Sequence, residues 1–544
     1  MINEIDLNLV GKKYFSSLED PLIPILLSKL YLSNKNIFFI SKDDNHLNAI
    51  ENFLSASIPN CNIISIPSWE TLPYYISSPN PNIVSKRILS FTNLLNGNFT
   101  DKKVIILTTF NALSIKTAPI DFYKNLYLTL DIDSKIVINS LKSLLSKYGY
   151  KKVDIVREFG EFSHRGDILD IFTNGFEDPI RINFFDENIE KIVRFNPLSQ
   201  RNIPSSDLKK IRIFSSKEYF LESNDLNVFK KKYRDCFDLD LKNDYFYKQI
   251  ISGQSPEGLE YFLDLFHENS LSTIFDFILN NKTLIGLITT IASKDCLESL
   301  NVRDKEIKLN YKNRISEKES NYLEPNKVYL SFDHLRENLY QFNTIFLDDF
   351  NSKNNEVVNF KSKKLILNSL ISSKKNIHDN NLQTFFVDQF SKYKSILIFI
   401  NDKTRLNNFV SFLEPVLISN DIKFHETKIE KFFQTKFENA LYFINSNIAY
   451  SFEFNNSLFI SESDVFGKNT QRRMNVKRKA DKFLTDLNSL NYNDYIAHVD
   501  HGVGQYKALE IMNISGHKHD CLKIIYSDGD KLFVPVENIN LLSK

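Results

Sequence analysis

Side chains that could bind a metal ion gather near the C-terminus of this sequence. They are His498, Asp500, His501, His517, His519 and Cys521. The last three alternate along an expected strand, which would put them on one face, and zinc accepts such nitrogen and sulfur ligands. Tetrahedral zinc, however, usually takes ligand pairs about two to four residues apart from separate turns, so solvent-facing strand positions explain these residues equally well. We expect no metal here.

Nucleotide chemistry needs a glycine-rich loop whose backbone N–H groups hold phosphates, followed by a lysine and a hydroxyl residue. The nearest candidate is Val10-Gly11-Lys12-Lys13, which lacks both the upstream glycine and the serine or threonine. Leu347-Asp348-Asp349 is typical of a turn after a strand, and Gly502-Val503-Gly504 lacks the rest of a dinucleotide-binding motif. The sequence therefore predicts no catalytic residues and no cofactor in this chain.

The composition is that of a folded protein with several domains. With 544 residues, of which 42% are hydrophobic, the chain is long enough for roughly three to four domains. Its 68 basic and 67 acidic side chains give a net charge of +1, so no overall positive field attracts nucleic acid. The four cysteines are far apart, and neither an export signal nor a membrane span is evident. We expect a cytoplasmic monomer that does not bind membranes.

Alternating strand and helix patterns predict an α/β domain at the N-terminus. Apolar runs at 37–40, 63–66 and 104–107 predict buried strands, and amphipathic stretches at 45–54 and 83–95 predict helices. Strands that are apolar throughout are typical of a parallel sheet covered on both faces. We therefore expect a doubly wound parallel-sheet domain.

The pattern changes at several points along the chain. Short runs at 153–156, 167–172 and 180–185, between glycine and proline turns, predict an α+β insert that interrupts the first domain. The expected order is the first half of the α/β domain at 1–118, the α+β insert at 119–214, the second half of the α/β domain at 215–349, a small α/β domain at 360–466, a basic linker at 467–485 and a small β-barrel at 486–544.

The linker and the barrel differ in charge. The linker contains bases that could contact DNA phosphates or simply be solvated, namely Arg472, Arg473, Lys477, Arg478 and Lys479. Residues 486–544 contain eight acids and five bases, which gives a net charge of −3. We expect the barrel to bind a protein, through strand addition at an exposed edge, rather than DNA.

Several segments of the chain together resemble a known family. The insert contains GEFSHRGDILDIF at 160–172, followed by PIRINFFD at 179–186 and FNPLSQR at 195–201. Further segments agree in order, namely PSWETLPY at 67–74, EGLEY at 257–261, SESDVFG at 461–467, DYIAHVDHGVG at 494–504 and LFVPV at 532–536. Over nearly the whole chain this strongly resembles the N-terminal portion of the bacterial transcription-repair coupling factor (Mfd) family.

The resemblance implies a UvrB-homology module over residues 1–349, which is a degenerate helicase-like domain without its nucleotide site. Only eight residues separate Tyr74 from Ile83, too few for the long DNA-gripping hairpin of UvrB. This module is therefore expected to act as an adaptor.

The resemblance also implies that the insert docks UvrA, and the matching positions are Arg165, Arg181 and Phe185. An arginine and an aromatic ring are typical interface anchors. From the residues alone, Arg165 could instead pair with Asp167 or Asp170. Phe185 could instead belong to the core, because neighbouring strand residues face opposite sides.

The barrel resembles the family's RNA-polymerase-interacting domain, which is CarD-like and Tudor-like. The resemblance implies contact with the polymerase β subunit near His498, Val499 and Asp500, with Val499 as the apolar contact. The alternative is that Val499 belongs to the barrel core.

Full-length members of the family continue into motor domains that use ATP and Mg to translocate on DNA, and these motifs are not among the 544 residues. A fragment, a truncated gene product and half of a split protein all fit this. We expect a non-enzymatic scaffold that links stalled RNA polymerase to UvrA in nucleotide excision repair. Two other functions stay open: a CarD-like RNA polymerase-binding transcription regulator and a UvrB-like damage-verification ATPase.

Overall fold

The computed structural model of the chain describes two units, Met1–Lys468 and Asn469–Lys544. The described residues are 13–347 without 59, 70, 72–73, 75–76, 125, 238–243, 293–294 and 318–320, then 357–365, 380–466 without 402, 420 and 428–439, 493–498, 502–535 without 515–516 and 527–528, and 542–543.

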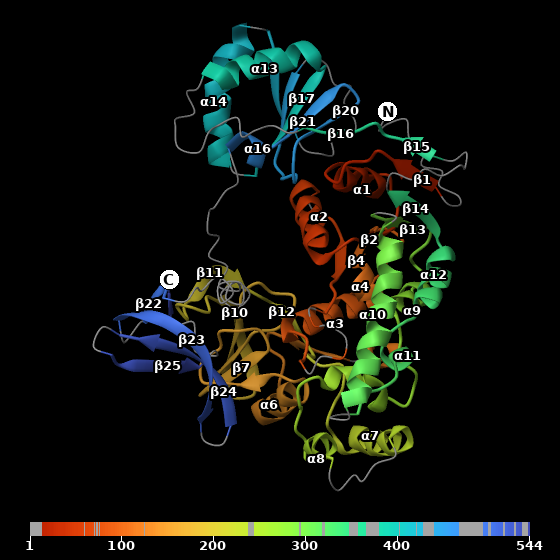
Figure 1. Cartoon of the computed structure of the whole chain (residues 1–544), viewed down its shortest axis with the longest axis vertical. Coiled ribbons are helices and arrows are strands. Elements are labelled where there is room, and N and C mark those ends of the chain that lie inside the picture. The colour runs from red at the N-terminus through yellow and green to blue at the C-terminus, as the bar shows by residue number, and fades with distance from the viewer. Residues whose placement is uncertain are drawn as a thin grey trace. The chain divides into compact units, whose positions relative to one another are not determined.

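The first unit contains a seven-stranded sheet in which all neighbouring strands are parallel. In spatial order the strands are β15 (Val357–Asn359), β1 (Lys13–Ser16), β14 (Asn343–Leu347), β13 (Ile288–Ile291), β2 (Ile37–Ser41), β4 (Ile105–Thr109) and β3 (Ile63–Ile66). Strands from before and after the insert therefore share one sheet, as the red and green strands show (Figure 1).

Both faces of this sheet are buried because its strands are apolar on both sides. Phe38 and Ile40 belong to one hydrophobic cluster, whereas Ile37 and Phe39 belong to another. Alternate strand residues point to opposite faces, so the two clusters lie on the two sides of the sheet. Helices α3 (Pro81–Asn96) and α9 (Ile274–Asn280) contribute to the first cluster, and helices α1 (Leu22–Leu32) and α2 (Asp44–Ser57) contribute to the second.

Polar residues in the sequence define where several of these helices begin. The Asp43 carboxylate accepts a 2.7 Å hydrogen bond from the backbone N–H of His46 at the start of α2. Thr273 and Asp276 form a capping box at the start of α9. These caps satisfy backbone N–H groups that the first turn of a helix leaves without partners.

The insert is a six-stranded sheet covered on one face by helix α6 (Ile138–Lys147). Its strands, in spatial order, are β11 (Asn202–Asp207), β10 (Asn188–Phe195), β9 (Ile180–Phe185), β8 (Ile168–Ile171), β7 (Glu161–Arg165) and β6 (Lys151–Lys152). All pairs are antiparallel except β6 with β7. The chain enters the insert through β5 (Tyr127–Asp131) and leaves it through β12 (Lys210–Phe214). These two strands pair with each other.

A second α/β sheet completes the first unit. Its strands, in spatial order, are β16 (Lys363–Lys364), β20 (Phe452–Phe454), β21 (Ser457–Ser461), β17 (Ser395–Phe399), β19 (Ala440–Ile444) and β18 (Lys423–Thr427). Helices α13 (Asn380–Lys392) and α14 (Lys403–Ser419) pack on one face. The other face joins the cluster of α2, where the Phe53 and Phe399 rings lie 6.2 Å apart and Ser57 hydrogen-bonds Ser446 at 3.0 Å.

The remaining described helices lie in the first unit. They are α4 (Phe110–Ser114), α5 (Ile120–Tyr123), α7 (Ser223–Cys236), α8 (Tyr245–Ile251), the 3-10 helix η2 (Leu259–Leu265), α10 (Asp295–Glu317), α11 (Pro325–Val328), α12 (Phe332–Tyr340) and α16 (Glu462–Phe466).

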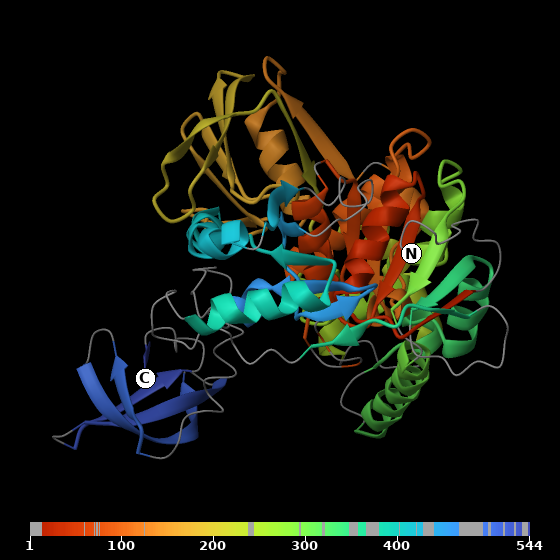
Figure 2. The same ribbon diagram turned by 90° about the horizontal axis from the view of Figure 1, so that it is seen from above.

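The second unit is a five-stranded antiparallel sheet, drawn in dark blue (Figure 2). Its strands, in spatial order, are β25 (Lys531–Pro535), β24 (His517–Ile525), β23 (Gly502–Ile514), β22 (Tyr495–His498) and β26 (Leu542–Ser543). Ile496, Ile524 and Val534 form its small core. A Cβ atom at Gly504 would lie 2.5 Å from Ile524, so this close approach requires glycine.

The predicted α/β fold with a parallel sheet and several smaller sheets is confirmed. The short run at 153–156 forms no strand, and side chains bind two of its carbonyls: Ser163 donates to the Asp154 carbonyl at 2.9 Å and Gln200 to the Val156 carbonyl at 3.0 Å. The predicted domain boundaries stay predictions. Among the described residues, no helix combines the length and the apolar character needed to cross a membrane.

Candidate docking surface

Strand β9 places two neighbouring phenylalanines on opposite faces of the insert sheet. Phe184 is 4% exposed and packs in the core with Ile182 beneath α6, whereas Phe185 is 69% exposed. Phe185 is the last residue of the strand, and Asp186 after it has a positive φ of 54°, which turns the chain toward β10. The alternative that Phe185 belongs to the core is therefore wrong. An exposed ring of this size is suited to anchor a protein interface.

Asp170 and Arg181 pair directly across β8 and β9, on the same face as Phe185. The Arg181 Nε donates to Asp170 Oδ1 at 2.8 Å, and Nη2 donates to Oδ2 at 2.9 Å. The Asp170 side chain is only 2% exposed. Hydrogen bonding to Asp170 raises the pKa of Arg181 above its ordinary value, although burial opposes this. The two side chains form a buried, bidentate ion pair.

Arg165 lies at the end of β7 and shares the same carboxylate. Its Nη2 is 3.7 Å from Asp170 Oδ2, and its side chain is 56% exposed. Of the two ion pairs considered from the sequence, the structure contains the one with Asp170. Ile168 lies directly opposite Arg165 in the β7–β8 ladder and is 38% exposed. An exposed cation therefore has an exposed apolar neighbour.

The three residues predicted for UvrA docking, Arg165, Arg181 and Phe185, thus lie on one face of one sheet, and their role in binding stays a prediction. Sequence reasoning did not single out Ile168. The sequence did contain a pattern that could have identified Ile168. Ile168 and Asp170 lie on one face of β8, opposite to the face of the buried residues Leu169 and Ile171.

The predicted polymerase contact falls on strand β22 of the second unit. His498 ends this strand and pairs with Gly502 of β23 and Leu542 of β26, whereas Val499 and Asp500 lie outside the described residues. Sequence reasoning missed Tyr495 and Val503, whose side chains are 67% and 62% exposed on β22 and β23. These two strands therefore present an exposed apolar surface beside the predicted contact.

The described residues contain no group of three or more histidine, cysteine or carboxylate side chains that could hold a metal ion. Solvent-facing strand positions were the alternative to a zinc site for the candidate ligands near the C-terminus, and this alternative is wrong for Cys521. This residue and Leu522 are both buried, because β24 is covered on both faces at this point. The other metal candidates lie, wholly or with their side chains, outside the described part of the chain.

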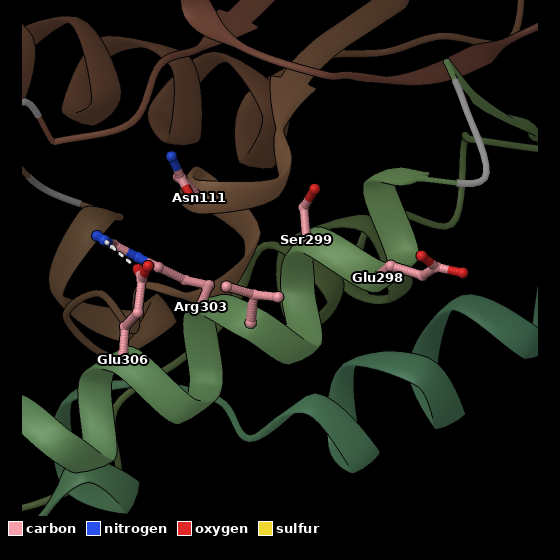
Figure 3. Close-up of a pocket in the computed structure, with 6 residues that line it drawn as sticks. Asn111, Glu298, Ser299, Arg303 and Glu306 are labelled. Carbon is pink, nitrogen blue, oxygen red and sulfur yellow. Dashed lines mark ion pairs between the residues drawn. The ribbon is translucent and has the colours of Figure 1, made fainter.

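A hollow of about 470 Å³ lies between α4 and α10 (Figure 3). It is lined by Asn111, Glu298, Ser299, Val302, Arg303 and Glu306. Arg303 and Glu306 point toward each other and form an ion pair of 3.8 Å. This lining includes no histidine, cysteine or lysine that could act as a base or nucleophile at neutral pH. It is typical of a solvated helix surface rather than of a reaction site.

Other segments that the sequence singled out lie outside the described residues. They are the bases Arg472, Arg473, Lys477, Arg478 and Lys479, and the segments 10–12 and 348–349. Contact between these bases and DNA stays a prediction.

Two family models match parts of this chain. A UvrB interaction domain matches residues 128–219, and a CarD-like/TRCF RID domain matches residues 490–544. The first contains the face with Arg165, Arg181 and Phe185, and the second contains β22 and β23. One polypeptide thus contains matches to both a UvrB interaction domain and a CarD-like domain.

Similar proteins carry the name transcription-repair-coupling factor. The chain is 30% identical over 497 residues to the one from Rickettsia typhi, covering 89% of this chain and 41% of that protein. It is 25% identical over 507 residues to the Escherichia coli protein, covering 89% and 40%, and 23% identical over 541 residues to a Staphylococcus aureus protein, covering 96% and 44%. The chain is similar to these transcription-repair-coupling factors over most of its own length and spans about two fifths of theirs.

Proposed function

We propose that this chain is a scaffold of transcription-coupled repair, which links a stalled RNA polymerase to UvrA for nucleotide excision repair. UvrA docks on the insert, and the β subunit of the polymerase docks on the second unit. The chain itself carries no catalytic residues and no cofactor. ATP-driven translocation on DNA belongs to motor domains of full-length family members.

The observation that carries this proposal is the exposed pair of Phe185 and Arg165 within the match to a UvrB interaction domain. An aromatic ring and a guanidinium are the side chains most often found as interface anchors. The ring lies on the outer face of the sheet, away from the core that Phe184 completes. Its exposure has no explanation in the folding of the insert itself.

Polymerase docking is supported by a separate surface. Tyr495 and Val503 are exposed on the first two strands of the part that matches a CarD-like domain, beside His498. The net charge of −3 over residues 486–544 disfavours DNA as the partner. We assign the polymerase contact to His498, Val499 and Asp500, extended by Tyr495 and Val503.

We also propose a finer description of the two units. We interpret the seven-stranded sheet as a doubly wound, degenerate helicase-like domain, because helices contribute to the clusters on both of its faces. We interpret the second unit as a Tudor-like barrel. The protein acts as a monomer in the cytoplasm.

The test is the affinity of the purified chain for bacterial UvrA, measured by calorimetry. We compare the wild type, the double variant Arg165→Ala/Phe185→Ala, and Val137→Ala. Val137 directly precedes α6 on the covered side of the insert sheet and is 47% exposed, so it serves as an exposed control. We expect the double variant to bind at least about 30-fold more weakly, equivalent to about 2 kcal/mol, and Val137→Ala to bind like the wild type.

The same proteins separate the other functions. Binding to RNA polymerase without any binding to UvrA would support the CarD-like transcription regulator instead. A rise in melting temperature with ATP would support the UvrB-like damage-verification ATPase, because a ligand that binds only the folded state stabilises it.

A further inference from the structure

The two arginines on the outer face of the insert differ in what their guanidinium groups already bind. Arg181 donates to both oxygens of Asp170, and its Nη1 donates to the Gln200 carbonyl at 3.3 Å and to Asn202 Oδ1 at 3.2 Å. All three nitrogens of Arg181 are therefore engaged within the insert. Its side chain is 16% exposed, and its guanidinium lies 4.6 Å from the centre of the Phe195 ring.

These bonds use four of the five N–H groups of Arg181, so a partner could make a two-pronged contact with this guanidinium only by breaking at least one of them. The cost would be high, because Asp170 is buried and a buried carboxylate without its cation is strongly unfavourable. Arg181 is thus committed to the fold of the insert.

Arg165 is in the opposite situation. Its only described ion pair is the 3.7 Å approach to Asp170, which is longer than a hydrogen bond, and more than half of its side chain is exposed. Such a loose pair contributes little to stability. It orients the guanidinium, however, and leaves its N–H groups able to bind a carboxylate in two-pronged geometry.

The exposed apolar side chains lie beside this cation on the same face. Ile168 is opposite Arg165 across the β7–β8 ladder, and Asn183 is opposite Ile168 across the β8–β9 ladder. Phe185 follows Asn183 on the same face of β9. Arg165, Ile168, Asn183 and Phe185 therefore form a continuous strip on this face. Along it, a cation is followed by an aliphatic side chain, an amide and an aromatic ring.

We propose that Asp170 is the positioning residue of this docking surface, that Arg181 acts only through Asp170, and that Arg165, Ile168 and Phe185 touch the partner. The matching surface on the partner carries an aspartate or glutamate beside an apolar pocket. This inference rests on the proposed docking of UvrA to the insert.

Two measurements on the same variants test it: the affinity for purified bacterial UvrA and the urea midpoint of unfolding of the chain alone. Arg165→Ala is expected to lower the affinity at least about 10-fold and to leave the urea midpoint unchanged. It is also expected to flatten the dependence of affinity on NaCl, because it removes the charge that meets the partner. Ile168→Ala is expected to weaken binding about 5-fold, also without a change in midpoint.

Arg181→Lys and Asp170→Asn are expected to behave differently. Each removes the bidentate pair, so each should lower the urea midpoint and the affinity together, while the slope of affinity against NaCl stays that of the wild type. Asp167→Asn is the matched control, because Asp167 is an exposed acid in the adjacent β7–β8 turn. It should change neither quantity.

Arg181→Lys with an unchanged midpoint but a lowered affinity for UvrA would overturn the proposal, because Arg181 would then contact the partner itself. If the wild type does not bind UvrA, the proposed function and the contact assignment both fail. The midpoints of Asp170→Asn and Arg181→Lys then still decide whether Asp170 holds the arginine pair.

Discussion

The hydroxyl of Tyr450 donates a 2.7 Å hydrogen bond to the carboxylate of Glu19, 431 positions earlier in the chain. The other carboxylate oxygen of Glu19 accepts from the backbone N–H of Lys364 at 3.1 Å, and the Glu19 N–H donates to Ser362 Oγ at 2.8 Å. Glu19 lies in the turn between β1 and α1. Residues in the second α/β sheet and directly before its strands therefore hold this turn in place. In nucleotide-binding α/β proteins, the corresponding turn holds phosphates.

We predict that Glu19 and Tyr450 stabilise the first unit as a coupled pair. Burial first, and then hydrogen bonding to Glu19, raise the pKa of Tyr450 above its ordinary value. Tyr450→Phe and Glu19→Gln should each cost about 1–2 kcal/mol, and the double variant should cost no more than the larger single effect. Urea unfolding followed by circular dichroism measures this.

Tyr245→Phe serves as the control for removal of a hydroxyl, because Tyr245 is 74% exposed. It should leave the unfolding curve unchanged. Strictly additive losses in the Glu19/Tyr450 double variant would show that the two side chains do not act together.

The two phenylalanines of β9 should separate stability from binding. Phe184→Ala removes a ring that is 4% exposed and should destabilise the insert by about 3–5 kcal/mol. Phe185→Ala removes a ring that is 69% exposed and should change stability by less than about 0.5 kcal/mol. Both changes delete the same atoms from adjacent positions, so each variant controls for the other in urea unfolding. Equal losses would mean that Phe185 is covered in solution.

The contrast between Phe184 and Phe185 also shows how much of the insert's structure could be predicted from the sequence. The alternation of β9 predicted that Phe184 and Phe185 face opposite sides, but either phase would bury one phenylalanine, so the pattern could not say which. The answer depends on α6, whose residues Leu141 and Leu145 cover one face of the sheet. A helix that is distant in sequence therefore decides the phase.

Polar contacts between segments distant in the chain were even harder to predict from the sequence. The apolar runs that became β2, β3 and β4 were recognisable, because burial on both faces leaves a continuous hydrophobic pattern. The pairing of Glu19 with Tyr450 leaves no periodic trace in either segment. Similarly, the sequence offered Asp167 and Asp170 equally as partners of Arg165, and only the strand register selects Asp170.

Buried His267 should make stability depend on pH. Burial lowers the pKa of His267 from 6.5 to about 4, while its Nε2 hydrogen-bonds the Glu218 carbonyl at 2.8 Å and its ring lies edge-on to Phe122. The nearby charges are Lys232, which lowers the pKa further, and Asp264, which raises it. The folded protein therefore keeps this histidine neutral at pH values where the unfolded chain protonates it.

Stability should consequently fall as the pH falls from about 6.5 to 4, by up to about 3 kcal/mol from this residue, with no further loss from it below pH 4. Urea unfolding at a series of pH values measures the slope. Because carboxylates also titrate near the acidic end, the relevant quantity is the difference between the wild type and His267→Gln. Parallel curves for the two proteins would contradict the prediction.

The cysteines should differ widely in their reactivity toward iodoacetamide. Cys236 is exposed at the end of α7, whereas Cys61 is partly buried and burial raises its pKa to about 12. Cys521 is fully buried. Because the thiolate is the reacting species, a shift of this size lowers the reactive fraction of Cys61 at pH 8 by about 1000-fold.

In a Cys296→Ser background, we therefore expect alkylation of the native chain at Cys236 within minutes. Cys61 and Cys521 should react only after urea is added, as read by peptide mass spectrometry. Adding Cys236→Ser should abolish the fast modification without changing the other two rates. Fast labelling of Cys61 in the native chain would mean that the segment around β3 opens in solution, because its thiol lies against Tyr31, whose side chain also binds the backbone N–H of Asn62.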